Sequence, residues 1–104
     1  MEEIMGISKS YQDSLIESLK NHEEAVAYLN EALEESLKGD AESQEVLLMA
    51  FRNVAEAQGG VGALAKKADV GRESLYKTLS PKGNPEWRTL MSLVRAMGIQ
   101  LRFA

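Results

Sequence analysis

Five side chains that can contact DNA lie close together in the segment 72–79, RESLYKTL. An arginine can donate two hydrogen bonds to guanine, a glutamate can accept one from cytosine, and a serine can pair with several bases. A tyrosine and a lysine further along suit phosphate or a thymine methyl group. If this segment is a helix in the major groove, we expect its exposed side chains to contact base pairs. They are Arg72, Glu73, Ser74, Tyr76 and Lys77.

A bend precedes this segment and would direct it outward. The apolar pattern is interrupted at Asp69-Val70-Gly71, which leaves two short predicted helices at 61–68 and 72–79. Helices of two turns are not stable alone, so we expect a pair crossing through a tight turn, a helix-turn-helix. Asp69 occupies the position that usually has a positive φ, and Gly71 is placed to cap the second helix. The residues expected to anchor this pair to the core are Leu64, Ala65, Val70, Leu75 and Leu79.

Four further residues are candidates for contacts to the DNA backbone. Gly60 and Val61 lie at the start of the first short helix, where free backbone N–H groups suit phosphate. Lys82 and Asn84 lie in the loop that follows the second short helix. Because contacts to phosphate position a protein without reading sequence, we expect these residues to orient the helical pair.

The net charge of −4 conceals two oppositely charged parts. Residues 1–58 hold 4 Lys and Arg against 13 Asp and Glu, a net charge of −9. Residues 59–104 hold 8 Lys and Arg against 3 Asp and Glu, a net charge of +5. Such a division indicates two different partners, one of them a polyanion that the basic part would hold.

Two long helices are predicted before the basic part. Asn21 and Asp40 are expected to cap helices over 21–39 and about 40–58, with Gly39 between them. The apolar residues recur at helical spacing and indicate that one face of each helix is buried. The predicted faces comprise Val26, Leu29, Leu33, Leu37, Val46, Leu47, Ala50, Phe51, Val54 and Ala57.

The ends of the chain are less regular. The segment 11–20 fits either a short helix or an extended arm. Asn84-Pro85 is expected to open a last helix that Gly98 ends, and the alternating tail Ile99 to Phe103 is expected to form a short strand. The residues expected to face the core from the last helix are Leu90, Leu93, Val94 and Met97, with Trp87 near its start.

Several classes of function are not expected from this composition. The chain has no cysteine, no apolar run long enough to cross a membrane and an acidic N-terminus, so we expect a cytoplasmic protein without disulfides. The sequence contains one histidine, His22, and lacks a glycine-rich phosphate loop or metal-ligand spacing. The pairs Glu23-Glu24 and Glu34-Glu35 are adjacent and do not share a helix face. We therefore expect neither an enzyme nor a bound metal or cofactor.

Over most of its length, from about Tyr11 to Leu101, the sequence resembles the probable addiction-module antidote proteins, antitoxins of HigA type with a lambda-repressor-like helix-turn-helix. The resemblance rests on AVAYLNEALEE, AFRNVAEAQGGVGALAKKADVGRESLYKTLSPKGNPEWRTL and AMGIQL. Asp69, Gly71 and about ten extra N-terminal residues depart from the common pattern. The resemblance implies an all-α bundle of about five helices, which here has an additional N-terminal helix and a short C-terminal strand.

The resemblance also implies two partners. One is double-stranded DNA of the protein's own operator, and the other is a small basic toxin of RelE/HigB-like type. We expect residues 40–104 to be the DNA-binding domain and the acidic residues 1–39, chiefly 11–37, to contain the toxin-binding region. The candidate toxin contacts are Glu24, Tyr28, Glu31, Glu34 and Glu35.

A homodimer is expected, since two-fold operators require two recognition helices about 34 Å apart. Either the tail Ile99 to Phe103 or the last helix, through Met91 or Val94, is a candidate interface. Two other readings stay open: a free-standing phage-like transcriptional regulator without a toxin partner, and an interaction module that has lost DNA binding.

Overall fold

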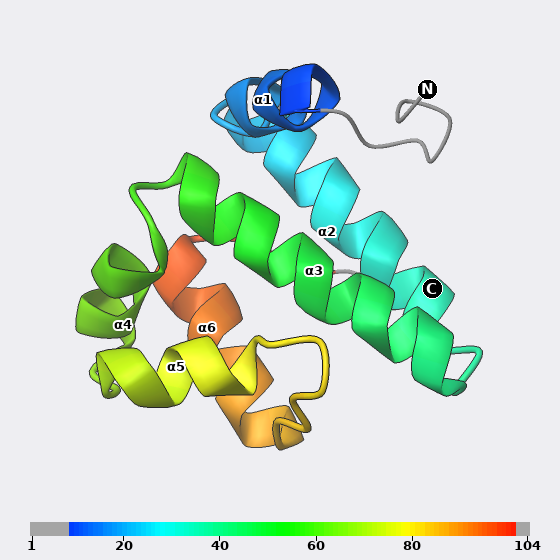
Figure 1. The fold of residues 1–104 in the computed structure, drawn as a ribbon, viewed down its shortest axis with the longest axis vertical. Coiled ribbons are helices and arrows are strands. Elements are labelled where there is room, and N and C mark those ends of the chain that lie inside the picture. The colour runs from blue at the N-terminus through cyan, green and yellow to red at the C-terminus, as the bar shows by residue number, and fades with distance from the viewer. Residues whose placement is uncertain (1–8, 102–104) are drawn as a thin grey trace.

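Six helices make up the computed structural model, which describes residues 9–101 (Figure 1). The all-α prediction is therefore confirmed over this range, with a radius of gyration of 13.3 Å. The segment that fitted either a helix or an extended arm is a helix. None of the helices within the described range is long and apolar enough to cross a membrane. The helices are α1 (Lys9–Ser18), α2 (His22–Ser36), α3 (Ala41–Ala57), α4 (Val61–Ala68), α5 (Arg72–Thr78) and α6 (Trp87–Met97).

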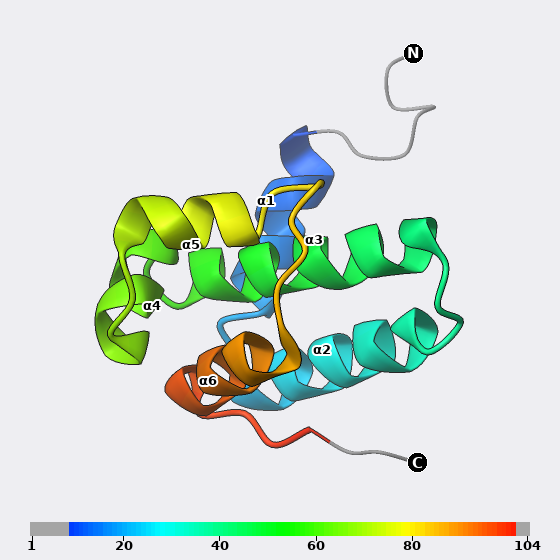
Figure 2. The same cartoon turned by 90° about the horizontal axis from the view of Figure 1, so that it is seen from below.

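The helices α2 and α3 lie side by side and form the base of the fold (Figures 1 and 2). Both begin at the predicted caps. The Asn21 side chain accepts a hydrogen bond from the Glu24 backbone N–H at 3.0 Å, and the Asp40 carboxylate accepts one from the Ser43 N–H at 2.8 Å. These bonds satisfy backbone donors that the first turn of a helix otherwise leaves open. Gly39 has a φ of 80°, a conformation that glycine adopts without a steric cost, and so permits the turn between the helices.

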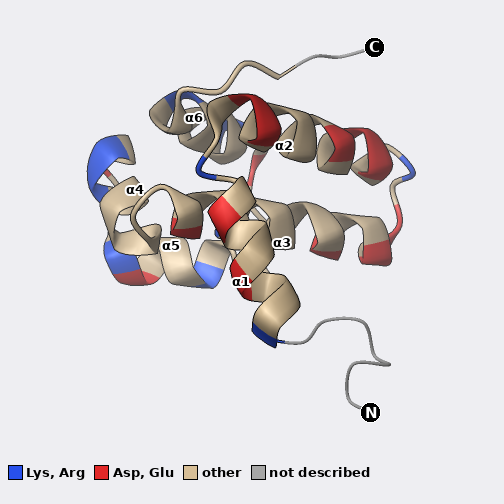
Figure 3. Ribbon diagram, turned by 90° about the horizontal axis from the view of Figure 1, so that it is seen from above, with Lys and Arg blue, Asp and Glu red and all other residues tan. Residues whose placement is uncertain are grey.

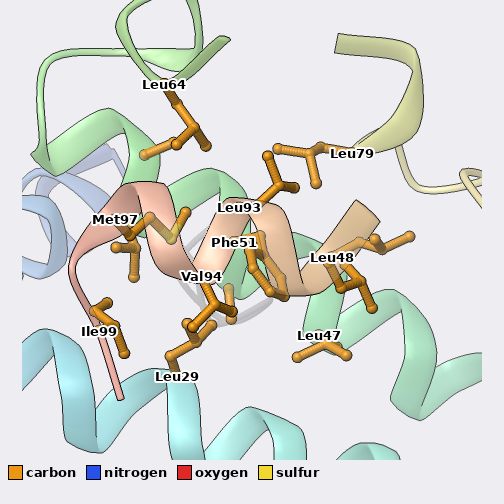
Figure 4. Close-up of a cluster of buried hydrophobic side chains, with 14 of the residues drawn as sticks. Leu29, Leu47, Leu48, Phe51, Leu64, Leu79, Leu93, Val94, Met97 and Ile99 are labelled. Carbon is orange, nitrogen blue, oxygen red and sulfur yellow. The ribbon is translucent and has the colours of Figure 1, made fainter. Parts of the chain in front are cut away.

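A continuous apolar core joins this pair to the C-terminal helices (Figure 4). The largest fully buried side chains come from four different helices or their ends, so the core fixes α5 and α6 against α2 and α3. They are Leu29, Phe51, Val54, Leu79 and Leu93. The helix α4 packs against α6 and α5, and the chain between α5 and α6 crosses α3 (Figure 2).

A buried polar network fastens α1 to this base. The Gln12 side chain donates a hydrogen bond to the Asn53 carbonyl oxygen at 2.8 Å, and the Asn53 amide donates to the Tyr28 hydroxyl at 2.9 Å. Asn53 is buried, so its amide would be costly to leave without partners. The network therefore fixes the position of α1 relative to α2 and α3.

Three expectations about the helix faces and ends are wrong. Leu37 is 68% exposed, because α2 ends at Ser36 and Leu37 belongs to its final cap. Val46 is at the surface, 36% exposed, and widens the apolar face of α3 only at its edge. The last helix begins at Trp87 with Glu86 as its cap, so Asn84-Pro85 lies in the preceding loop. Trp87 is itself more than half exposed.

The expected C-terminal strand is not present in residues 99–101, and Arg102 to Ala104 lie outside the described residues. Ile99 is buried in the protein's own core, close to Leu29 in Figure 4, where its backbone N–H donates to the Val94 carbonyl. Val94 is buried as well. Met91 and Leu101 are only partly buried, so the last helix and the tail both stay predictions for a dimer interface.

The cap at Asp40 leads to a prediction about acid stability. Hydrogen bonding to the Ser43 side chain, and then to its backbone N–H, lowers the pKa of Asp40 from its ordinary value of 3.8. A lowered pKa in the folded state contributes stability above the unfolded value, and this contribution is lost as the pH falls through the folded pKa. We expect the melting temperature of Asp40→Asn to lie below that of the parent at neutral pH. The difference should shrink progressively as the pH falls below 3.8, as followed by circular dichroism; a difference that does not change with pH would contradict it.

Candidate nucleic-acid interface

The turn between α4 and α5 has the backbone conformation that the sequence indicates. Asp69 is left-handed, with φ 59° and ψ 46°, and it is the non-glycine residue with positive φ among residues 9–101. The Val70 backbone N–H donates to the Ala65 carbonyl at 3.0 Å and closes the end of α4. Gly71 is extended and caps α5 without a side-chain hydrogen bond. The predicted roles of Asp69 and Gly71 are therefore confirmed.

Four of the five predicted anchors hold this pair on the core. All four are buried: Leu64 and Ala65 of α4, Leu75 of α5, and Leu79, which caps the C-terminal end of α5. The expectation for Val70 is wrong, since its side chain is 39% exposed. The turn places this residue at the outer corner of the bend, while its backbone N–H, rather than its side chain, ties it to α4.

The outward face of α5 carries the five predicted contact residues. All five are exposed, and the Glu73, Ser74, Tyr76 and Lys77 side chains border one shallow surface depression. The Arg72 guanidinium lies over the Tyr76 ring, 5.8 Å from its centroid. Such stacking favours one direction of the arginine side chain along the helix surface.

Arg72 is also in close contact with α4. An added Cβ on Gly62 would lie 3.4 Å from the Arg72 Nε, so the arginine passes directly over this glycine. Gly62 and the Tyr76 ring thus flank the Arg72 side chain from two helices. The guanidinium remains exposed and can still donate its hydrogen bonds to an external acceptor.

The sign of the surface charge changes across the molecule (Figure 3). Residues 61–84 carry five exposed Lys and Arg residues against two acidic ones, a net charge of +3. The helix α2 carries five Glu and no Lys or Arg. In the ribbon of Figure 3, positions coloured as basic residues occur on α4 and α5, and positions coloured as acidic residues occur along α2 and α3. The basic face consists of Lys66, Lys67, Arg72, Lys77 and Lys82.

The four predicted backbone contacts do not all lie in one place. Gly60 caps α4, and Val61 is the first residue of α4 and has a buried side chain. Lys82 is exposed in the loop after α5. Asn84 instead lines an apolar groove with Trp87 and Leu37, between that loop and the ends of α2 and α3.

Two residues that support α5 have no signal in the sequence pattern. Arg52 of α3 donates a hydrogen bond to the Leu79 carbonyl and so holds the C-terminal end of α5. Gly83 lies against the same end, with its N–H donating to the Ser80 carbonyl at 2.8 Å. The Arg52 contact joins α3 to the end of α5, which only the folded structure brings together, whereas the Gly83 bond closes a local turn in the loop after α5.

Gly83 provides a prediction about stability. A Cβ at this position would lie 2.0 Å from the Thr78 carbonyl oxygen, which belongs to rigid helix backbone. We expect Gly83→Ala to lower the free energy of unfolding by about 1–3 kcal/mol, because the loop must move away from α5. Urea denaturation measures the change. The control is Gly62→Ala inside α4, where only the flexible Arg72 side chain is near. Equal stability of Gly83→Ala and the parent would contradict the packing.

The acidic candidates lie along α2. Glu24, Glu31, Glu34 and Glu35 are exposed, and Tyr28 is half-buried. A groove between α2 and α3 is lined by Tyr28, Glu31, Ala32, Glu35, Val46 and Ala50, so the structure brings three of the five candidates together there. Within residues 9–101, no group of three His, Cys, Asp or Glu side chains could hold a metal ion.

Comparisons with known proteins cover almost the whole described chain. A family model with the description "Probable addiction module antidote protein" matches residues 9–104. A Haemophilus influenzae protein named "Uncharacterized protein" is 36% identical over 86 residues, which are 83% of this chain and 81% of that protein. No solved structure matches the chain significantly.

Proposed function

Because the chain belongs to the family of probable addiction module antidote proteins, we propose that it is the antitoxin of a type II toxin–antitoxin module. In this proposal it binds and neutralises a small basic toxin of RelE/HigB-like type and represses its own operon by binding DNA. It acts by binding, as a cytoplasmic protein, and not as an enzyme. The family match carries this conclusion.

DNA binding is proposed from the α4–α5 pair. A left-handed Asp69 closes α4 and directs α5 outward, and α5 exposes Arg72, Glu73 and Lys77 on a basic face. This arrangement supports a helix-turn-helix of lambda-repressor-like, HigA type, with α5 as the recognition helix. Two such helices reading a two-fold operator require a homodimer.

Toxin binding is proposed for the acidic helix α2. Toxins that cleave RNA need basic surfaces, and a negatively charged helix attracts and orients such a protein. The helix α2, with five Glu and no basic residue, supplies this charge at a distance in sequence from the DNA-binding pair. Residues 11–37 remain the proposed toxin-binding region.

Co-expression with the adjacent gene tests the proposed function. We expect the product of that gene to arrest growth when expressed alone, and this chain to relieve the arrest and to co-purify with it. Growth arrest that persists, with no co-purification, would contradict an antitoxin. Specific binding of promoter DNA without relief would instead identify the free-standing transcriptional regulator.

A further inference from the structure

An apolar groove runs between α2 and α3 on the acidic side of the molecule. Two buried alanines, Ala32 and Ala50, form its floor because their short side chains leave a hollow between the helices. The half-buried Tyr28 ring and the partly exposed Val46 side chain form its walls. The groove therefore exposes apolar surface to solvent at a point where the fold itself does not cover it.

The polar network beneath the groove holds it in shape. The Tyr28 hydroxyl accepts a hydrogen bond from the Asn53 amide at 2.9 Å, and Asn53 in turn accepts one from Gln12 at 2.8 Å. These bonds restrict rotation of the tyrosine ring. A partner can thus bind without first having to order this wall of the groove.

The charges on the rim determine what kind of partner fits. Glu31 and Glu35 lie one helical turn apart on the rim, an arrangement of like charges that is unfavourable for an isolated helix. Glu35 forms an ion pair with Lys38 at 2.6 Å, between two exposed side chains. A second copy of the chain related by two-fold symmetry would place the same negative rim opposite itself. A basic partner gains from both carboxylates.

We propose that this groove is the docking site for a basic segment of the toxin, an inference that rests on the proposed antitoxin function. The aliphatic stem of an arginine or lysine lies against Tyr28 and Val46, and its charged head pairs with Glu31 and Glu35. An arginine can in addition stack on the tyrosine ring. The groove thus identifies a local contact within the broader acidic region.

Two pairs of variants test this proposal, with the product of the adjacent gene as the probe and full-length chain throughout. Glu31→Gln/Glu35→Gln is expected to weaken binding at least about tenfold in calorimetry at physiological salt. Its control, Glu42→Gln/Glu56→Gln, removes the same charge from two exposed carboxylates of α3 that lie outside residues 11–37. The control is expected to bind within about twofold of the parent, since it leaves the groove unchanged.

The second pair tests the apolar wall. Val46→Arg fills the groove with a positive charge and is expected to weaken binding at least about tenfold. Val70→Arg adds the same charge at an apolar residue of similar exposure, 39% against 36% for Val46, in the turn between α4 and α5, and should bind within about twofold of the parent. Circular dichroism confirms that each variant is folded, because all the altered side chains lie at the surface.

The outcomes separate this inference from the proposed function. Weaker toxin binding by Glu31→Gln/Glu35→Gln and Val46→Arg, but not by their controls, supports the groove as the docking site. Equal weakening by the charge-matched control, an equal or larger effect of Val70→Arg, or unchanged binding of every variant would overturn it while leaving the antitoxin function in place. Failure of the parent protein to bind the probe would contradict both.

Discussion

Leu79→Ala is expected to lower the free energy of unfolding by about 2–5 kcal/mol and to weaken DNA binding as well. Leu79 is 0% exposed and caps α5, and Figure 4 shows it opposite Leu93 of α6. Truncation removes buried apolar contacts and leaves a cavity that the surrounding helices fill only in part. Because Arg52 binds the carbonyl of the same residue, the loss occurs where α5 is attached to α3. Thermal and urea denaturation measure the stability.

The control for this prediction is the same substitution at an exposed leucine. Leu37 is 68% exposed, so Leu37→Ala should change stability by no more than about 0.5 kcal/mol. Similar losses for both variants would show that burial at Leu79 is not what attaches α5. A domain of this size is stable by only about 5–15 kcal/mol, so the Leu79 variant should also lose a measurable part of its DNA affinity at elevated temperature.

Arg72→Ala is expected to reduce discrimination at one base pair of the operator by about 1–3 kcal/mol. The Arg72 side chain extends over Gly62 and stacks on Tyr76, which orients its guanidinium before DNA arrives. A contact to a base edge carries sequence information, so its loss should affect the preferred base and spare unrelated DNA. Fluorescence anisotropy with single-base variants of the upstream promoter measures this preference.

Lys82→Ala is the companion variant, because a lysine in the loop after α5 is expected to contact phosphate. It should weaken binding to all sequences alike and reduce the dependence of log affinity on log salt by about one unit. If Arg72→Ala kept both the affinity and the base preference of the parent, α5 would not be the recognition helix.

Local signals explain what the sequence could predict. The boundaries of α4 and α5, the left-handed Asp69 and the caps Asn21 and Asp40 agree with the structure, because each depends on residues within one or two turns of the chain. Turn and cap chemistry acts at this range and is therefore readable from a single sequence.

Contacts between distant residues could not be predicted in this way. The bond from Arg52 to Leu79, the Asn53 network and the approach of Gly83 to Thr78 join residues far apart or in different elements. The exposed Leu37 shows the related limit. Periodicity placed Leu37 on the buried face of α2. The helix ends one residue earlier, at Ser36, so Leu37 does not continue that face.

The difference between local signals and contacts of distant residues also applies to the candidate site. The outward residues of α5 follow from helical spacing, and all five are exposed as expected. Which residues of α2 meet α3 does not follow from spacing alone. The groove at Tyr28, Glu31 and Val46 depends on how two helices pack, and periodicity placed Val46 on the buried face.

If α5 binds DNA and the oppositely charged α2 binds the toxin, changes on α2 should leave DNA recognition intact. A titration of the upstream promoter DNA at rising salt with the parent, Arg72→Ala/Lys77→Ala and Glu31→Gln/Glu35→Gln tests it most directly. We expect the parent to prefer the promoter over unrelated DNA by about 10³ or more, the α5 variant to lose that preference, and the α2 variant to keep it. Equal affinity of the parent for promoter and unrelated DNA, or a loss of preference in the α2 variant alone, would contradict the claim.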